Sequence, residues 1–349
     1  METKDLEFAL KLAQPCLLSV DFIPILSHYC FDTGMVYAYD DVSAVVVDCN
    51  TDLKCGLRGD TLLGLVGLAG EKITLKQGKE KVEIISGNSH LELPFLQPKD
   101  FQFQFPQQDT LSEFSLSEDI LQGLTLCAAG VGKDPRKPEF TGVTLQLGTK
   151  PAFYASDNTS IIKYVPANAV GKKALEVIVP KSICDQILAT VTALSAELEK
   201  VMMTVTAEFL IIQFSATTPN VTIVGKHLTV KAAKFEKIIE GCETNKPKFA
   251  IPEDFHKAVA KVVLVTSKEL QRGCELQTQR EALWVRGQGA LGKAETKFST
   301  DHIVLPDVTV ICSPEHLTSM LSNVTHMIVD EKVIQMRGEK LSYYVASRA

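Results

Sequence analysis

The stretch Ser117-Glu118-Asp119-Ile120-Leu121 has the composition of a helix start. A serine that can cap the helix comes first, and two acids follow in the first turn, where carboxylates interact favourably with the helix dipole. Five other stretches begin in a similar way: residues 5–10 (DLEFAL), 59–63 (GDTLL), 180–184 (PKSIC), 252–255 (PEDF) and 313–317 (SPEHL). Apolar runs typical of strands follow each of them, so the sequence predicts one helix-plus-strands unit repeated six times.

The repeats are spaced by roughly 55 to 70 residues, which is longer than the unit of a solenoid. Taken in pairs, they predict three similar domains of roughly 110 to 120 residues, a normal domain size. We place these domains at residues 1–110, 111–228 and 229–349. Because strands outnumber the short helices, the predicted fold class is α+β.

Each predicted domain also contains a hairpin pattern, in which two alternating apolar runs flank turn-forming residues. The paired runs are residues 28–31 with 35–41, 142–147 with 152–157, and 273–278 with 282–286. The helix that starts near residue 255 carries an apolar stripe with helical spacing, made by Phe255, Ala258, Val259, Val262 and Val263. These patterns predict helices that pack one face on antiparallel sheets.

The bulk composition limits the function classes. The 349 residues carry a formal net charge of −6, which argues against a protein that grips nucleic acid over its whole surface. A basic region confined to one face stays compatible with this charge. No apolar run approaches the roughly 20 residues of a membrane span, and the acidic N-terminus lacks a signal-peptide core, so we expect a cytoplasmic protein. Nine cysteines without CxxC pairs indicate reduced core thiols.

The sequence offers little that resembles a catalytic or cofactor motif. A literal GxGxxG lies at residues 287–292, but a strand pattern follows it instead of a helix, so it predicts a hairpin turn. The dispersed histidines match no zinc spacing, and the sequence contains no Walker A loop and no GxSxG elbow. Asp40 and Asp41 are interpreted as turn residues, since neighbouring strand residues point to opposite faces. We therefore expect no catalytic residue, no metal and no cofactor.

Several short stretches, taken together with their order, resemble the bacterial DNA sliding clamp, the beta subunit of DNA polymerase III. They are residues 23–26 (IPIL), 141–143 (TGV), 155–157 (ASD), 177–180 (VIVP) and 271–274 (QRGC). The resemblance covers nearly the whole chain, as a shared layout with short matching segments. It implies the DNA clamp fold, with three domains of two half-repeats each, helices lining a central pore and antiparallel sheets outside.

The resemblance also implies a function without catalysis. A sliding clamp is a processivity factor that encircles duplex DNA without sequence preference and tethers the replicative DNA polymerase. Its partners are the polymerase, a clamp loader ATPase and a second copy of the chain in a head-to-tail homodimer. Six helices per chain would give a ring of twelve. By analogy, the dimer contact joins Phe101 and Phe103, in an expected strand at residues 101–105, to Val265 and Thr266.

The basic residues expected to face DNA in such a pore lie on the predicted helices and on one loop. They are Lys4, Lys11, Lys133, Arg136, Lys137, Lys181, Lys257 and Lys261. For each of them alone, a solvated helix face is the alternative interpretation. The recurrence of basic residues at corresponding helix positions favours DNA contact.

The clamp family also has a pocket that binds short linear peptides of partner proteins. The positions that match it are Phe140, Ser156, Asp157, Asn158, Thr159, Ser160, Ile161, Ala233, Lys237, Ile238, Val345, Ala346, Ser347 and Arg348. Three features depart from the family pattern. Asn158-Thr159-Ser160 replaces a Gly-His-Arg loop, the tail lacks Met and Pro, and Val20-Asp21 replaces an expected basic residue. A divergent clamp carried by a phage or plasmid would fit these departures.

Two alternatives stay open at this point. One is a two-domain clamp that assembles as a trimer, which three domain-level copies argue against. The other is a β-rich structural or binding protein without a DNA role, which would explain the repeats, the acidity and the missing catalytic groups equally well. An enzyme ranks third, since no acid/base or metal constellation is visible.

Overall fold

The computed structural model describes residues 1–18, 23–217, 219–242, 246–268, 273–300 and 302–347. The chain forms two compact units, Met1–Ser117 with Asp185–His227 and Glu118–Cys184 with Leu228–Ala349. Val20, Asp21, Gln271, Arg272 and Arg348, which the sequence analysis singled out, lie outside the described residues.

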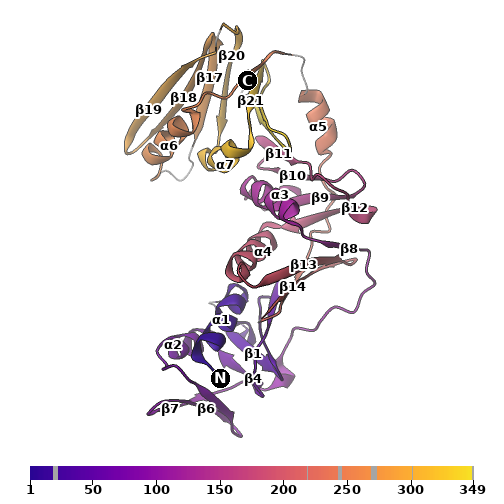
Figure 1. Cartoon of the computed structure of the whole chain (residues 1–349), viewed down its shortest axis with the longest axis vertical. Helices are drawn as coiled ribbons and strands as arrows, with labels where there is room; N and C mark the ends of the chain where they lie inside the picture. Colours follow the sequence, from indigo (N-terminus) through magenta and orange to yellow (C-terminus); the bar gives the residue numbers. More distant parts are fainter. Residues whose placement is uncertain (19–22, 218, 243–245, 269–272, 301, 348–349) are drawn as a thin grey trace. The chain divides into compact units, whose positions relative to one another are not determined.

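The first unit is built on an eight-stranded antiparallel sheet in the order β4-β1-β2-β3-β15-β14-β13-β8. Its strands are β1 (His28–Asp32), β2 (Met35–Tyr39), β3 (Ser43–Asp48), β4 (Lys54–Arg58), β8 (Ser112–Ser115), β13 (Leu198–Val205), β14 (Phe209–Ala216) and β15 (Val221–Lys226). A three-stranded sheet contains β5 (Thr74–Gln77), β6 (Lys81–Ser86) and β7 (Ser89–Pro94). Helix α1 (Thr3–Ala13) packs on β2 and β3. It also packs on α2 (Gly59–Gly67), beside which it lies in Figure 1.

The second unit repeats this plan with the order β12-β9-β10-β11-β23-β22-β21-β16. The strands are β9 (Gly142–Gly148), β10 (Ala152–Ser156), β11 (Ser160–Tyr164), β12 (Val170–Pro180), β16 (Lys248–Ala250), β21 (His326–Asp330), β22 (Val333–Arg337) and β23 (Leu341–Ala346). A four-stranded sheet, in the order β19-β18-β17-β20, contains β17 (Cys274–Arg280), β18 (Ala282–Gly289), β19 (Gly292–Ser299) and β20 (Leu305–Cys312).

The helices of the second unit cover these sheets. Helix α3 (Glu118–Ala129) packs on β9, β10 and β11, and α6 (Phe255–Val265) packs on β17, β18 and β19. Helix α7 (Pro314–Met320) contacts both α3 and α6. Helix α4 (Lys181–Leu194) begins in the second unit and continues in the first. A further short helix, α5 (Phe235–Cys242), follows β15.

The structure confirms the α+β fold class, all six predicted helices and all three hairpins. The cap at Ser313 is seen directly, because its Oγ accepts a hydrogen bond from the backbone N–H of His316. The stripe on α6 is buried at Phe255, Ala258, Val259 and Val262. Helix α5 was not predicted. Both eight-stranded sheets combine strands from two of the three predicted domains, so the boundaries at residues 110 and 228 stay a prediction.

The strand expected at residues 101–105 is wrong. The structure has no regular secondary structure from Phe101 to Thr110. The resemblance implied this strand, but the rings of Phe101 and Phe103 pack on a sheet face instead. The ring of Tyr37, on β2, lies 5.9 Å from that of Phe101 and 5.5 Å from that of Phe103, measured between centroids. Phe101 and Phe103 therefore have an apolar packing role within their own chain.

The cysteines behave as predicted. All nine are free thiols, and all but the partly exposed Cys242 are buried. Burial raises the pKa of the Cys30 thiol to about 12, so this group stays protonated and unreactive near neutral pH. Among the described residues, no helix is long and apolar enough to cross a membrane.

The GxGxxG motif forms the predicted hairpin turn, in which Gly289 of β18 pairs with Gly292 of β19. Its first glycine has a packing role, because a Cβ at Gly287 would lie 2.4 Å from Cγ1 of Val262 on α6. The motif therefore allows close approach of a helix to a sheet instead of phosphate binding.

We expect Gly287→Ala to lower the free energy of unfolding by about 1–3 kcal/mol, since the added methyl overpacks the contact with α6. Urea unfolding followed by circular dichroism measures this loss. Gly64→Ala on α2 is the matched control, because a Cβ there meets nothing within 4 Å. Equal midpoints for the two variants would contradict the packing role of Gly287.

Candidate functional site

A rigid turn between β10 and β11 positions the candidate site in the second unit. Asp157 Oδ1 accepts hydrogen bonds from the backbone N–H of Thr159 at 2.9 Å and of Ser160 at 2.7 Å. The Ser160 hydroxyl donates to the same oxygen at 2.9 Å. Asn158 has a φ of 76°, a backbone conformation that asparagine tolerates better than most residues. The Asp157 carboxylate and the Ser156 hydroxyl, which donates to Ser160 O and accepts from the Asn158 N–H, therefore hold the turn together.

The turn borders an apolar pocket of about 190 Å³. Helix α5 forms one wall, with Phe235 stacked on Tyr154 at 5.2 Å and an interplanar angle of 6°. Strands β22 and β23 contribute the opposite wall through Val333, Tyr344 and Ala346. Ile238 of α5 lines the pocket while it is still 46% exposed, so the apolar surface is open to an incoming side chain.

A polar network fastens α5 to the sheet beneath it. The hydroxyl of Tyr154 donates to Glu236 of α5, and Lys163 Nζ lies 2.9 Å from Glu236 Oε1. Burial alone would raise the pKa of Glu236, but the hydrogen bonds from Tyr154 and Lys163 and the lysine charge lower it overall. Glu236 therefore stays ionised and holds the wall of the pocket in place.

The structure brings most of the sequence-predicted pocket residues together. Those that line the pocket are Phe140, Ser156, Asn158, Thr159, Ser160, Ile161, Ile238 and Ala346. Ala233 packs on the apolar cluster below, and Asp157 holds the turn. Val345 is 0% exposed and belongs to the core, so its expected place in the pocket is wrong. Because alternate residues of a strand point to opposite sides of the sheet, Tyr344 and Ala346 face the pocket and Val345 points away from it.

The other two predicted pocket residues that the structure describes, Lys237 and Ser347, are not among the residues that line the pocket. Lys237 lies exposed on α5, and the backbone N–H of Ser347 donates to Lys332 O. Sequence reasoning missed five lining residues: Phe235, Cys242, Lys332, Val333 and Tyr344. Phe235 and Ile239 show the helical spacing that would have indicated α5. The other missed positions carry no local signal, because β-sheet pairing brings them to the pocket.

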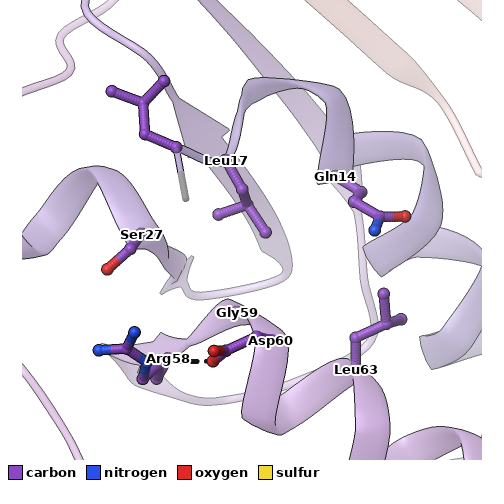
Figure 2. A pocket seen from close by; sticks show the side chains of 8 residues that line it. Gln14, Leu17, Ser27, Arg58, Gly59, Asp60 and Leu63 are labelled. Atoms are coloured by element: carbon purple, nitrogen blue, oxygen red, sulfur yellow. Dashed lines mark hydrogen bonds and ion pairs between the residues drawn. The ribbon is translucent and has the colours of Figure 1, made fainter. Parts of the chain in front are cut away.

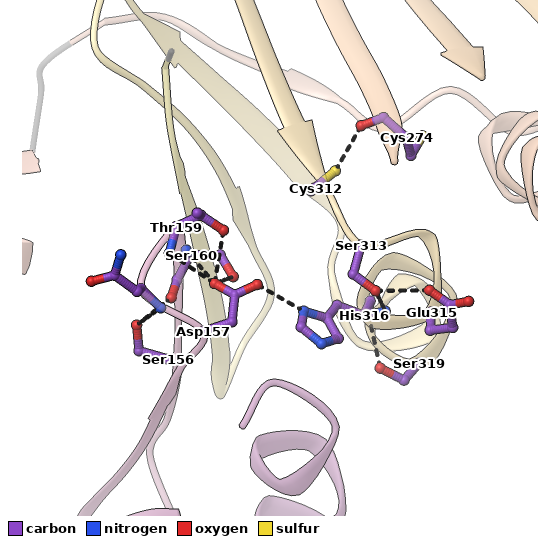
Figure 3. A network of polar contacts seen from close by, with 11 residues as sticks. Ser156, Asp157, Thr159, Ser160, Cys274, Cys312, Ser313, Glu315, His316 and Ser319 are labelled. Atoms are coloured by element: carbon purple, nitrogen blue, oxygen red, sulfur yellow. Dashed lines mark hydrogen bonds and ion pairs between the residues drawn. The ribbon is translucent and has the colours of Figure 1, made fainter. Parts of the chain in front are cut away.

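The turn is also linked to helix α7. His316 Nδ1 lies 3.7 Å from Asp157 Oδ2, while Asp157 Oδ1 holds the turn (Figure 3). Burial lowers the pKa of His316, which favours the neutral ring, and the nearby carboxylates of Asp157 and Glu315 oppose this shift. The contact joins the pocket to the helix layer of the same unit.

The predicted DNA-facing cations divide into two groups. Lys4, Lys11, Lys133, Arg136, Lys257 and Lys261 are exposed, whereas Lys137 and Lys181 are partly buried. Three of the exposed cations lie close to carboxylates: Lys11 with Glu7 at 2.7 Å, Lys257 with Asp254 at 2.7 Å, and Arg136 with Asp134 at 2.9 Å. Such exposed pairs are weak, so they leave the cations available to a stronger anion.

Lys137 differs from the cations on the helices, because its side chain is hydrogen-bonded at the pocket. Its Nζ lies 2.7 Å from Asn158 Oδ1, at the rim of the pocket. Arg58, which the sequence analysis missed, lies directly before α2 and lines a cavity of about 290 Å³ with Gln14, Leu17 and Ser27 (Figure 2). Its guanidinium Nε lies 3.1 Å from Asp60 Oδ1, so the charge is partly balanced within the cavity.

The residues expected on the domain-three side of the dimer contact lie at the end of α6. Thr266 is 1% exposed, and its hydroxyl donates to Val262 O at 2.8 Å, so its side chain is occupied within its own chain. Val265 is partly exposed, and the adjacent Leu264 is 69% exposed. The apolar surface at this helix end therefore centres on Leu264.

No protein-family model matches the chain, and no curated protein matches it in sequence. Solved structures match it over nearly its full length. A putative DNA polymerase III beta subunit from Eubacterium rectale has a TM-score of 0.84 and 13% identity, covering 99% of this chain and 97% of its own. The DNA polymerase III beta subunit from Pseudomonas aeruginosa has a TM-score of 0.79 and 15% identity, covering 100% and 99%.

A third neighbour is the Helicobacter pylori beta clamp in a structure bound to a DNA ligase peptide. Its TM-score is 0.79 at 14% identity, covering 100% of this chain and 99% of its own. At these identities the likeness establishes the fold. The chain has the fold of the DNA polymerase III beta subunit sliding clamps.

Proposed function

We propose that the protein is a DNA sliding clamp, a non-catalytic processivity factor that encircles duplex DNA and tethers a replicative polymerase. The full-length likeness to beta-subunit clamps is the observation that carries this proposal. The three pairs of repeats would form three domains, at residues 1–110, 111–228 and 229–349. A clamp loader ATPase would open the ring on DNA, and linkage would then be topological.

The internal repeat supports closure by a second copy of the chain. Strand β15 pairs with β3, and β23 pairs with β11, so each junction joins the last strand of one repeat pair to the strand that follows the predicted hairpin of another. Two strands in equivalent positions have no such partner in the described part of the chain: β7, the last strand of the first repeat pair, and β19, which follows the hairpin of the third. Both end their own sheets, without a second strand partner among the described residues. We infer that β7 of one chain pairs antiparallel with β19 of its partner, a heterologous contact that can close a ring.

The helices support the same junction. Helices α3 and α7, which belong to neighbouring repeats, pack together in the second unit. The corresponding helices at the open ends are α6 and α2. A highly exposed leucine lies at the C-terminal end of each: Leu264 in the last turn of α6, 69% exposed, and Leu68 directly after α2, 87% exposed. Burying both leucines in a contact between chains would account for this exposure. This assignment replaces the expected contact through Phe101, Phe103 and Thr266.

The cations on the helices would supply weak phosphate contacts. Lys4 and Lys11 on α1, Arg58 before α2, and Lys257 and Lys261 on α6 are spread sparsely along the helices. Each phosphate contact releases counterions and makes affinity depend on salt. A sparse set would therefore let the duplex slide, while residence time would depend on ring opening.

The pocket beside α5 would receive the linear peptides of polymerase and other partners. Its apolar floor and fixed turn suit a side chain presented by an extended peptide. The ligase peptide on the H. pylori clamp is a case of peptide binding on this fold. The departures at Asn158-Thr159-Ser160 suggest that the preferred peptide differs between clamps.

We expect Ile238→Glu to weaken peptide binding at least about tenfold, because it places a charge on the apolar wall of the pocket. Linear heptapeptides selected from a random library on the wild-type chain serve as probes in fluorescence anisotropy. Val165→Glu is the control, with a similarly exposed residue (42%) that does not line the pocket. Equal affinities of both variants would show that the selected peptides bind elsewhere.

The proposal as a whole is tested by primer extension with the polymerase and loader of the same source. A clamp lengthens the products of single binding events, whereas a structural protein without a DNA role leaves product length unchanged. A trimeric two-domain relative would be distinguished by its mass in solution.

A further inference from the structure

The turn that borders the pocket has a counterpart in the first unit. Between β2 and β3, Asp40 Oδ1 accepts hydrogen bonds from the backbone N–H of Val42 at 3.0 Å and of Ser43 at 2.6 Å. Asp41 has a φ of 74°, close to the 76° of Asn158 in the other turn. The β2–β3 hairpin therefore repeats the hairpin that supports the candidate peptide pocket.

The aromatic floor is repeated as well, but its cover differs. Tyr37 on β2 corresponds to Tyr154 on β10. In the second unit, helix α5 covers Tyr154 through Phe235. In the first unit, the irregular segment at residues 101–110 covers Tyr37, with the Phe103 ring centroid 5.5 Å away. An extended segment fills less space than a helix, so the same sheet face is more open here.

This difference leaves a groove of about 710 Å³ on the face of β2 and β3. Its apolar lining consists mainly of Met35, Tyr37, Val46, Phe103 and Phe105. The ring of Phe105 is 47% exposed and lies 5.2 Å from that of Phe103 between centroids. The groove of the first unit is therefore larger than the pocket of the second unit, and its lining is partly apolar and partly polar.

The segment beside the groove also offers free backbone groups. Residues 102–110 form no backbone–backbone hydrogen bond with other described residues. An extended chain laid into the groove could pair with these groups, as in strand addition to an exposed edge. Paired backbone groups with pockets for alternate side chains are the mode by which strand addition recognises an extended peptide.

The charge of the groove indicates what such a peptide carries. Asp32 is the only charged residue that lines it, and Asp32 is exposed and forms no ion pair within the described part of the chain. Among the described residues that line the pocket of the second unit, Lys332 is the only charged one. The two sites therefore differ in sign, and they should select different partners.

We propose that this groove is a second docking site, which binds an extended segment of a partner protein with apolar side chains and a lysine or arginine. Asp32 pairs with the basic side chain, and the aromatic floor receives the apolar ones. The site is separate from the pocket beside α5 and does not depend on closure of a ring.

The test uses the full chain and two fluorescein-labelled octapeptides, one alternating leucine with lysine and one alternating leucine with glutamate. The lysine peptide should bind more tightly, and Asp32→Lys should weaken it at least about tenfold. Glu80→Lys, in the exposed turn before β6, makes the same charge change outside the groove and should leave affinity within about twofold. Equal losses in both variants would reduce the effect to net charge and overturn the proposal.

A second pair of variants tests the apolar wall. Phe105→Ala should weaken the lysine peptide, whereas Val42→Ala, a similarly exposed residue (49%) outside the groove, should not. Ile238→Glu should leave this affinity intact, since it alters only the other pocket. If Phe105→Ala changes the mass in solution instead of peptide binding, the groove is a contact between copies of the chain and the proposal is wrong.

Discussion

Leu264→Glu should convert the proposed homodimer into single 38.2 kDa chains. The side chain is 69% exposed in the chain itself, so the substitution costs little in the fold. In the proposed junction it would bury a carboxylate without a partner, which raises the dimer dissociation constant at least roughly a hundredfold. Sedimentation equilibrium over a range of concentrations measures the change.

Val304→Glu provides a closely matched control for this experiment. Val304 is 70% exposed in the segment before β20, so the substitution makes the same apolar-to-acid change at almost the same exposure. It should leave the dimer intact. Leu68→Glu, at the other side of the proposed junction, should dissociate the dimer as Leu264→Glu does. A dimer that survives both leucine substitutions would place the junction elsewhere.

On DNA, the expected result is retention that salt does not remove. Once its loader has placed the protein on nicked circular DNA, a high-salt wash should leave most of it bound. Ordinary phosphate contacts lose affinity steeply as salt rises, by orders of magnitude for several contacts. A closed protein ring stays bound, because it cannot leave circular DNA without opening. Leu264→Glu should be lost from the same circle at least about tenfold faster, because its ring does not close.

The sequence predicted those parts of the fold that depend on local patterns. The six helix starts and the hairpins could be predicted because caps, acids in first turns and alternating apolar residues lie within a few positions of one another. The strand at residues 101–105 was expected from the resemblance, and that prediction failed because Phe101 and Phe103 pack on a sheet face instead of pairing with a strand. A strand requires a partner that its own sequence does not specify.

The candidate site was predictable only where the resemblance supplied matching positions. In this way the turn residues Asn158, Thr159 and Ser160 were predicted, and they line the pocket beside α5. Tyr344 reaches the pocket because β23 pairs with β11, which joins segments far apart in the sequence. Lys332, directly before β22, reaches it because β22 pairs with β23. Helix α5 is short, and stacking of Phe235 on Tyr154 and the Glu236 network hold it in place. These contacts are tertiary, so the only local signal for α5 was the helical spacing of Phe235 and Ile239.

The most direct test of encirclement is to cut the loaded circle. The protein is loaded on circular DNA, washed at high salt, and the circle is opened at one site with a restriction enzyme. If two chains enclose the duplex, the protein slides off the new ends within minutes while it stays on an uncut circle. Equal retention on cut and uncut DNA, or equal loss from both, would contradict a topological link.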